Sequence, residues 1–146
     1  MLANQYFMSG KFQDAVPLLE RTVESHPDDL RALRKLIICY VATCQTACAL
    51  TKMEHLLALA PAGASDIRRS EEGCPCPRLV ERWSTDPPVG LSGYDYLVSM
   101  GILQFFCGDQ KALDWFRRAG MLRPDAQVGA RVFDEMKHHF AAAQGR

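Results

Sequence analysis

The sequence predicts an all-α protein in which pairs of helices, each joined by a tight turn, are stacked side by side. Outside Pro61–Gly93, apolar residues recur three and four positions apart, which is the spacing of one face of an α-helix. Three markers also return 34 positions further along the chain: Tyr6, Ala15 and Pro27 are followed by Tyr40, Ala49 and Pro61. Such a period indicates a repeated helix pair that buries its apolar face only against a neighbouring pair.

The first predicted pair covers about residues 1–27. A short helix over residues 1–9 leads to Gly10, which permits a tight turn because it has no Cβ. The second helix runs from Phe12 to Ser25, and Pro27 ends it because the residue before a proline resists helical angles. Its inner face carries residues at helical spacing: Ala15, Leu18, Leu19, Thr22 and Val23.

The second predicted pair covers about residues 28–61. Asp28 and Asp29 place carboxylates at the positive end of the next helix, where they are favoured. That helix, over residues 30–44, is apolar on nearly every side, which predicts burial from two directions. Its partner helix runs from Thr46 to Leu59 and turns five residues inward: Ala49, Leu50, Met53, Leu56 and Leu57.

The repeat pattern then breaks. Residues 62–91 are rich in Gly, Pro, Ser and charged residues, which is typical of loops, so we interpret this stretch as an insertion or a decayed repeat. One short helix is expected inside it, over Pro77–Ser84. In that helix Leu79, Val80 and Trp83 share one face.

A third pair is expected over about residues 92–124, followed by a capping helix over 127–142. Ser92 is a suitable N-cap for a helix over Tyr94–Cys107, and Gly108 begins the turn to a partner helix over Lys111–Leu122. The last helix is amphipathic, with the polar outer face that a stack of repeats needs at its end. All these parts are expected to form a single domain over residues 1–146.

Charge and hydropathy argue against several classes of protein. Seventeen basic residues balance 17 acidic ones, whereas a nucleic-acid-binding domain usually carries a basic excess. No run of about 18 apolar residues exists, so we expect no membrane insertion. The N-terminal stretch lacks the charge and apolar pattern of a signal peptide: MLANQYFMSGK. We therefore expect the protein in the cytoplasm or an equivalent reducing compartment.

The three predicted pairs share a motif of a turn glycine, an alanine and a closing proline. The first pair supplies Ala3, Gly10, Phe12, Ala15, Leu19 and Pro27. The second keeps Tyr40, Ala49 and Pro61 but has Cys44 at the turn glycine. The third, whose turn is one residue shorter, has Gly101, Gly108, Ala112, Phe116, Ala119 and Pro124. In this motif the chain resembles the tetratricopeptide repeat family.

The resemblance implies a short right-handed superhelix in which the first helix of each pair lines a concave groove. In the family that groove usually holds a peptide or helix of another protein. Carried onto this sequence, the groove positions are Asn4, Phe7, Met8, Arg31, Arg34, Ile38, Val41, Val98, Ile102, Phe105 and Phe106. We expect an apolar floor, with Arg31 and Arg34 forming a basic patch that holds an acidic group of the partner.

The function expected from the resemblance is that of a scaffold, adaptor or chaperone-like binder. The alternative is a self-assembling unit that forms homo-oligomers through the groove or through open repeat ends. Two arrangements would cover the floor: repeats preceding Met1, or an insertion that folds back and fills the groove with Leu79, Val80 and Trp83.

No pattern in the sequence indicates catalysis, and we expect neither an enzyme nor a cofactor. No cysteine stands beside a histidine and a carboxylate in a recognisable arrangement, although a nucleophile needs a base within reach. We interpret the six cysteines as reduced thiols that serve mainly as small apolar residues. Cys74 and Cys76 leave two alternatives open: zinc ligation, which normally needs about four ligands, and a disulfide or redox role.

Overall fold

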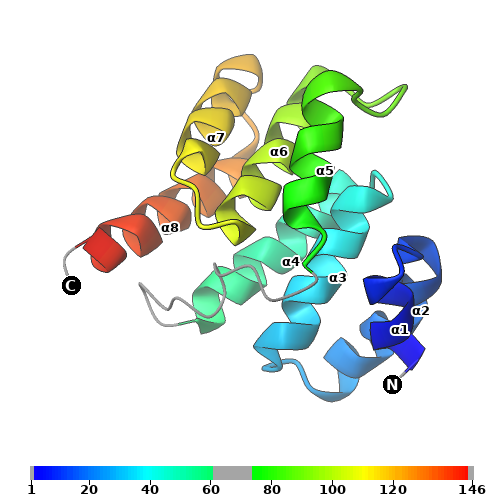
Figure 1. Ribbon diagram of the computed structural model, residues 1–146. Coiled ribbons are helices and arrows are strands. Elements are labelled where there is room, and N and C mark those ends of the chain that lie inside the picture. The colour runs from blue at the N-terminus through cyan, green and yellow to red at the C-terminus, as the bar shows by residue number, and fades with distance from the viewer. Residues whose placement is uncertain (1, 61–73, 145–146) are drawn as a thin grey trace.

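The computed structural model describes residues 2–60 and 74–144, and within them it contains eight helices and no strand (Figure 1). The predicted all-α class is confirmed. The helices are α1 (Leu2–Met8), α2 (Phe12–Ser25), α3 (Leu30–Ala42), α4 (Thr46–Leu59), α5 (Cys76–Thr85), α6 (Gly93–Phe106), α7 (Lys111–Leu122) and α8 (Gln127–Gln144). None of them is long and apolar enough to cross a membrane.

The three turns inside the helix pairs have the same backbone geometry. Gly10, Cys44 and Gly108 each adopt a positive φ, of 78°, 63° and 74°. In every case the next residue donates its N–H to a carbonyl five positions back, at 2.8–3.0 Å: Lys11 to Tyr6, Gln45 to Tyr40 and Asp109 to Gln104. This is the hydrogen-bond pattern of a Schellman cap. The second pair therefore keeps the turn although Cys44 replaces the usual glycine.

Small residues allow the two helices of each pair to approach closely. Ala15, Ala49 and Ala112 have no exposed surface, and each lies within the first four residues of the second helix of its pair. In the third pair Gly101 of α6 faces the ring of Phe116 in α7. These positions belong to one continuous apolar core that extends through all three pairs.

The third pair joins the first two in a different way from that expected for a regular stack. In the first two pairs, α3 packs along both α2 and α4. The next neighbour of α4 is α8, which lies along it, whereas α6 only touches α3 and α4 (Figure 1). An ion pair between Arg131 and Glu54 ties α8 to α4 at the surface. The helix expected as a cap therefore closes the structure against the second pair.

Helix α5 covers one side of α6. It extends one residue beyond each end of the expected helix, and packs along α6 with Leu79 and Trp83 buried and Val80 half-buried. The Tyr96 hydroxyl of α6 donates a 3.0 Å hydrogen bond to the carbonyl of Trp83. Of the predicted insertion over residues 62–91, the part up to residue 73 lies outside the described residues.

Candidate functional site

The first helices of the three pairs share one face of the molecule, which we call the first-helix face. Lys35 of α3 donates a 2.7 Å hydrogen bond to the side-chain oxygen of Asn4 in α1 and lies over the ring of Phe7. Arg34 of α3 lies over the ring of Phe106 in α6, 5.1 Å from its centroid. These contacts connect α1 to α3 and α3 to α6, so the family's groove positions do come together.

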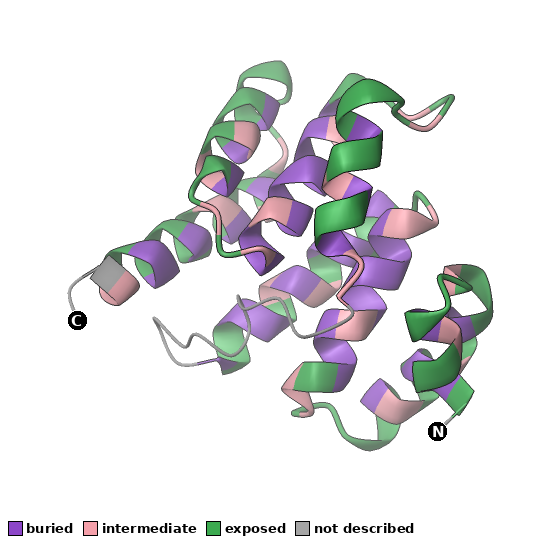
Figure 2. Cartoon of the chain, viewed as in Figure 1, coloured by how far each residue is buried: buried purple, intermediate pink, exposed green. Residues whose placement is uncertain are grey.

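Most of the predicted groove residues are nevertheless buried. They lie mainly on α3 and α6, two helices that are largely buried (Figure 2). Asn4, Met8 and Arg31 are exposed. The other eight are core residues: Phe7, Arg34, Ile38, Val41, Val98, Ile102, Phe105 and Phe106. The physical reason is that α3 and α6 are in contact with each other and α5 packs along α6. The expected open apolar floor is therefore covered, and these eight side chains offer very little surface to a partner.

Arg34 departs most from its expected role at the edge of a groove. Only 3% of the residue is exposed, and its guanidinium donates a 2.9 Å hydrogen bond to the sulfur of Cys74, just before α5. Its Nε has no hydrogen-bond partner among the described residues. Arg34 therefore holds the start of α5 on the first-helix face instead of reaching towards a partner.

An open cleft remains where α5 begins, beside the turn between α1 and α2. We call it the α1–α5 cleft; its volume is about 680 Å³. Its lining combines apolar, small and basic side chains: Phe7, Met8, Ser9, Gly10, Phe12, Cys74, Pro75, Pro77, Arg78, Leu79 and Arg82. Half of the Met8 surface is exposed here. Among the residues that line the cleft in the described part of the chain, none is acidic.

The sequence of α5 explains how this helix supplies the basic side of the cleft. Pro77 fits the first turn of a helix, where a missing N–H costs little. Arg78 and Arg82 are four residues apart, so they lie on the same face. Leu79 and Trp83, also four apart, lie on the neighbouring face and are buried. Burial of one face thus leaves both arginines exposed beside the cleft.

The cleft also contains a perturbed thiol. A hydrogen bond from the Cys76 thiol, a backbone hydrogen bond from Cys76 and the Arg34 guanidinium together lower the pKa of Cys74 to about 5, although partial burial opposes this change. The same hydrogen bond and complete burial raise the pKa of Cys76 well above its ordinary value. The two neighbouring thiols therefore differ strongly in their tendency to ionise.

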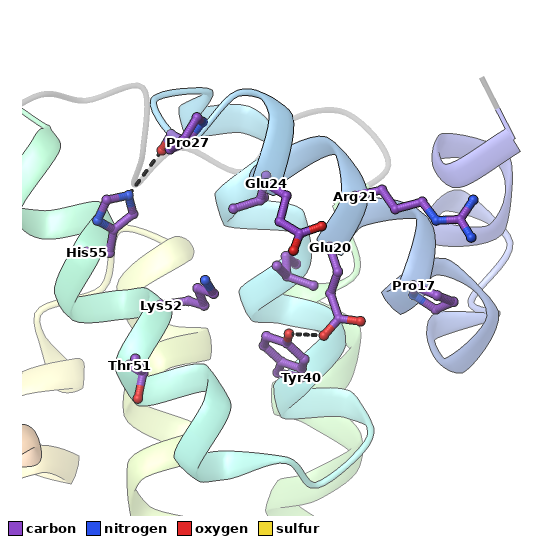
Figure 3. A pocket seen from close by; sticks show the side chains of 11 residues that line it. Pro17, Glu20, Arg21, Glu24, Pro27, Tyr40, Thr51, Lys52 and His55 are labelled. Carbon is purple, nitrogen blue, oxygen red and sulfur yellow. Dashed lines mark hydrogen bonds between the residues drawn. The ribbon is translucent and has the colours of Figure 1, made fainter.

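A second hollow, of about 790 Å³, lies between α2 and α4 over α3 (Figure 3). Its charged side chains are of both signs, with Glu20 and Glu24 opposite Lys52. The Tyr40 hydroxyl donates a 2.5 Å hydrogen bond to the Glu20 carboxylate. The pKa of Tyr40 is raised mainly by burial of its hydroxyl and further by this neighbouring carboxylate. His55 is within 3.1 Å of the Pro27 carbonyl. The charges in this hollow are mixed, and several of its polar groups already form hydrogen bonds within the protein. It therefore favours one kind of ligand less clearly than the α1–α5 cleft does.

The sequence interpretation missed Arg78 and Arg82. The signal was present, because the helix expected over Pro77–Ser84 already placed an apolar face beside two arginines at helical spacing. What the pattern could not provide was the surface on which this helix packs. Without that surface, the exposed side of the helix could not be assigned to a cleft.

Comparisons with known proteins bear on the first two helix pairs. Residues 6–68 match the family model described as tetratricopeptide repeat. A search of curated proteins and a search of solved structures each gave no match. The repeats of this family are non-enzymatic and generally mediate interactions between proteins. This match agrees with the 34-residue period and the shared turn geometry of the segment 6–68, which is therefore similar to the tetratricopeptide repeat family.

Proposed function

We propose that the chain is a protein-interaction module that holds an acidic, amphipathic segment of another protein in the α1–α5 cleft. The observation that carries the proposal is the lining of the cleft, which offers apolar surface around Met8, two exposed arginines and no described acidic residue. A partner segment with apolar residues on one side and carboxylates on the other complements this lining.

Arg78 and Arg82 are available for such a partner. Neither forms an ion pair within the described part of the chain. Exposed cationic groups of this kind attract an acidic partner over a distance and select against basic ones. Met8 supplies a flexible, polarizable contact that adapts to different apolar side chains.

The size of the cleft supports the same reading. A volume of about 680 Å³ accommodates several side chains of a bound segment and lies within the range of ligand sites in proteins, roughly 300–1,000 Å³. Asn4 and Met8, which the family resemblance placed in the groove, remain exposed at the α1 end of the first-helix face. In this proposal the buried groove residues act indirectly, because they position α5 and with it the two arginines.

A displayed library of random peptides tests the proposal. Peptides of about 12 residues, long enough to lie along such a cleft, should be enriched in Asp and Glu together with Leu, Met or Phe. The double change Arg78→Glu and Arg82→Glu should weaken binding of the selected peptides roughly tenfold or more. Arg21→Glu is the matched control, because Arg21 is also exposed but lines the hollow between α2 and α4.

Selection of basic or uncharged peptides would contradict the proposal, as would binding that survives the double change. Light scattering on the purified protein distinguishes another occupant of the cleft. If the protein forms oligomers that the double change disrupts, the cleft holds a second copy of the chain, and the proposal of a separate acidic partner fails.

A further inference from the structure

Arg34 is a buried cation, and among the described residues its side chain donates a hydrogen bond to a sulfur atom, that of Cys74. It is 3% exposed, and no carboxylate of the described residues lies within ion-pairing distance of it. A guanidinium removed from water is stable only when an anion or several hydrogen bonds compensate for the lost hydration. The sulfur of Cys74, at 2.9 Å, can provide that anion if its thiol ionises.

Arg34 donates directly to this sulfur at 2.9 Å. The thiol and the backbone N–H of Cys76, two residues further on, also contribute to lowering the pKa of Cys74. Donors around a cysteine sulfur favour the thiolate, because the neutral thiol gains much less from accepting these hydrogen bonds. Arg34 also places a positive charge 2.9 Å from this sulfur, which disfavours a second cation at the same position.

The two thiols differ in accessibility. Cys74 is half-buried and lines the α1–α5 cleft, so a small reagent can reach its sulfur from solvent. Cys76 begins α5 and has no exposed surface. An accessible thiolate beside a protected second thiol is the arrangement in which oxidation yields a disulfide instead of continuing to higher oxidation states.

We propose that Cys74 is a reactive thiolate that hydroperoxides oxidise, and that Cys76 then forms a disulfide with it. In the first step the Cys74 sulfur attacks the terminal oxygen of ROOH, the O–O bond breaks, and the departing RO⁻ takes a proton from water. The product is a sulfenic acid on Cys74. In the second step the Cys76 sulfur attacks the Cys74 sulfur, and the departing hydroxyl takes the Cys76 proton and leaves as water. The two sulfurs lose two electrons, and the hydroperoxide is reduced to an alcohol and water.

The first test is alkylation of the folded protein with iodoacetamide, with each cysteine followed by peptide mass spectrometry as the pH is varied. The Cys74 rate should be half-maximal near pH 5 and constant above about pH 6.5. At pH 6 it should exceed that of an ordinary exposed thiol roughly tenfold, after allowance for the lower nucleophilicity of a weakly basic thiolate. Cys44 and Cys48 are exposed and serve as references in the same sample.

The second test is treatment with one equivalent of hydrogen peroxide. The wild type should lose about 2 Da and two alkylatable thiols, and the disulfide should map to Cys74 and Cys76. In Cys76→Ser, a sulfenic acid on Cys74 should be trapped by dimedone. Arg34→Lys, which keeps a charge, and Cys76→Ala should each move the midpoint of Cys74 alkylation to higher pH. The proposal is overturned if Cys74 in the folded wild type reacts no faster at pH 6 than Cys44, or if peroxide leaves both thiols intact.

Discussion

The contact between α6 and α7 leads to a quantitative prediction for Gly101→Ala. A Cβ added to Gly101 would lie 2.4 Å from one ring carbon of Phe116 and 2.6 Å from another. Carbon atoms that are not bonded prefer separations of about 3.5–4.0 Å, so the ring has to move by about 1 Å. Phe116 is 3% exposed and stacks on Phe133 of α8 with 6.5 Å between ring centroids, which prevents it from swinging into solvent.

The expected change in stability follows from two opposing effects. Overpacking of a core costs about 1–3 kcal/mol, and the severity of this contact favours the upper end of that range. Alanine returns up to about 1 kcal/mol because it is a better helix former than glycine. Gly101→Ala should therefore lower the free energy of unfolding by about 2 kcal/mol and the melting temperature by about 4–8 °C.

Gly120→Ala is the matched control. Gly120 lies in α7, and a Cβ added there meets no atom within 4 Å. This variant should gain up to about 1 kcal/mol from helix propensity alone. Urea denaturation followed by circular dichroism at 222 nm measures both variants. If Gly101→Ala is as stable as Gly120→Ala, the close approach of α6 and α7 described above is incorrect.

Three further predictions concern the repeats and the cleft. Ala15→Trp and Ala49→Trp should each lower the free energy of unfolding by about 1–3 kcal/mol or more, because both alanines have no exposed surface; melting curves like that of the wild type would contradict their assigned positions. Cys44→Gly should raise the free energy of unfolding by about 0.5–1 kcal/mol, because glycine adopts the positive φ of 63° without strain. A loss of stability in urea denaturation would refute the shared turn geometry. Arg78→Glu alone should reduce the affinity for an acidic peptide most at low salt, because added ions screen exposed charges; an effect independent of salt in titration calorimetry would argue against an electrostatic role.

The repeated helix pairs could be predicted from the sequence because their information is local. Apolar periodicity fixed the helices, and the spacing of Gly10 and Gly108 to the following helices indicated the turns. The turn at Cys44 lacks the usual glycine but has the same hydrogen bonds as the other two turns. Neighbouring helices hold the chain in that conformation, since tertiary packing can stabilise a residue that glycine would fit better.

The candidate site could be predicted only in part, because an apolar residue at a groove position and one in a core look alike in sequence. Ile38 and Ile102 are equally suited to an open floor and to the packed core in which both are buried. Arg34 shows the same difficulty for a charged residue, since its burial depends on Cys74, 40 positions away in the chain. Such long-range pairings are set by how α5 folds back, which local patterns do not specify.

The most direct test of the α1–α5 cleft as a partner site is a methyl spectrum of protein labelled at its methionines. Met8 lines the cleft and is 50% exposed, whereas Met121, on α7, is 78% exposed and does not line it. Titration with a selected acidic, amphipathic peptide should shift the Met8 methyl signal in proportion to occupancy and leave that of Met121 in place. A saturated peptide complex in which the Met8 signal does not move would contradict binding in the cleft.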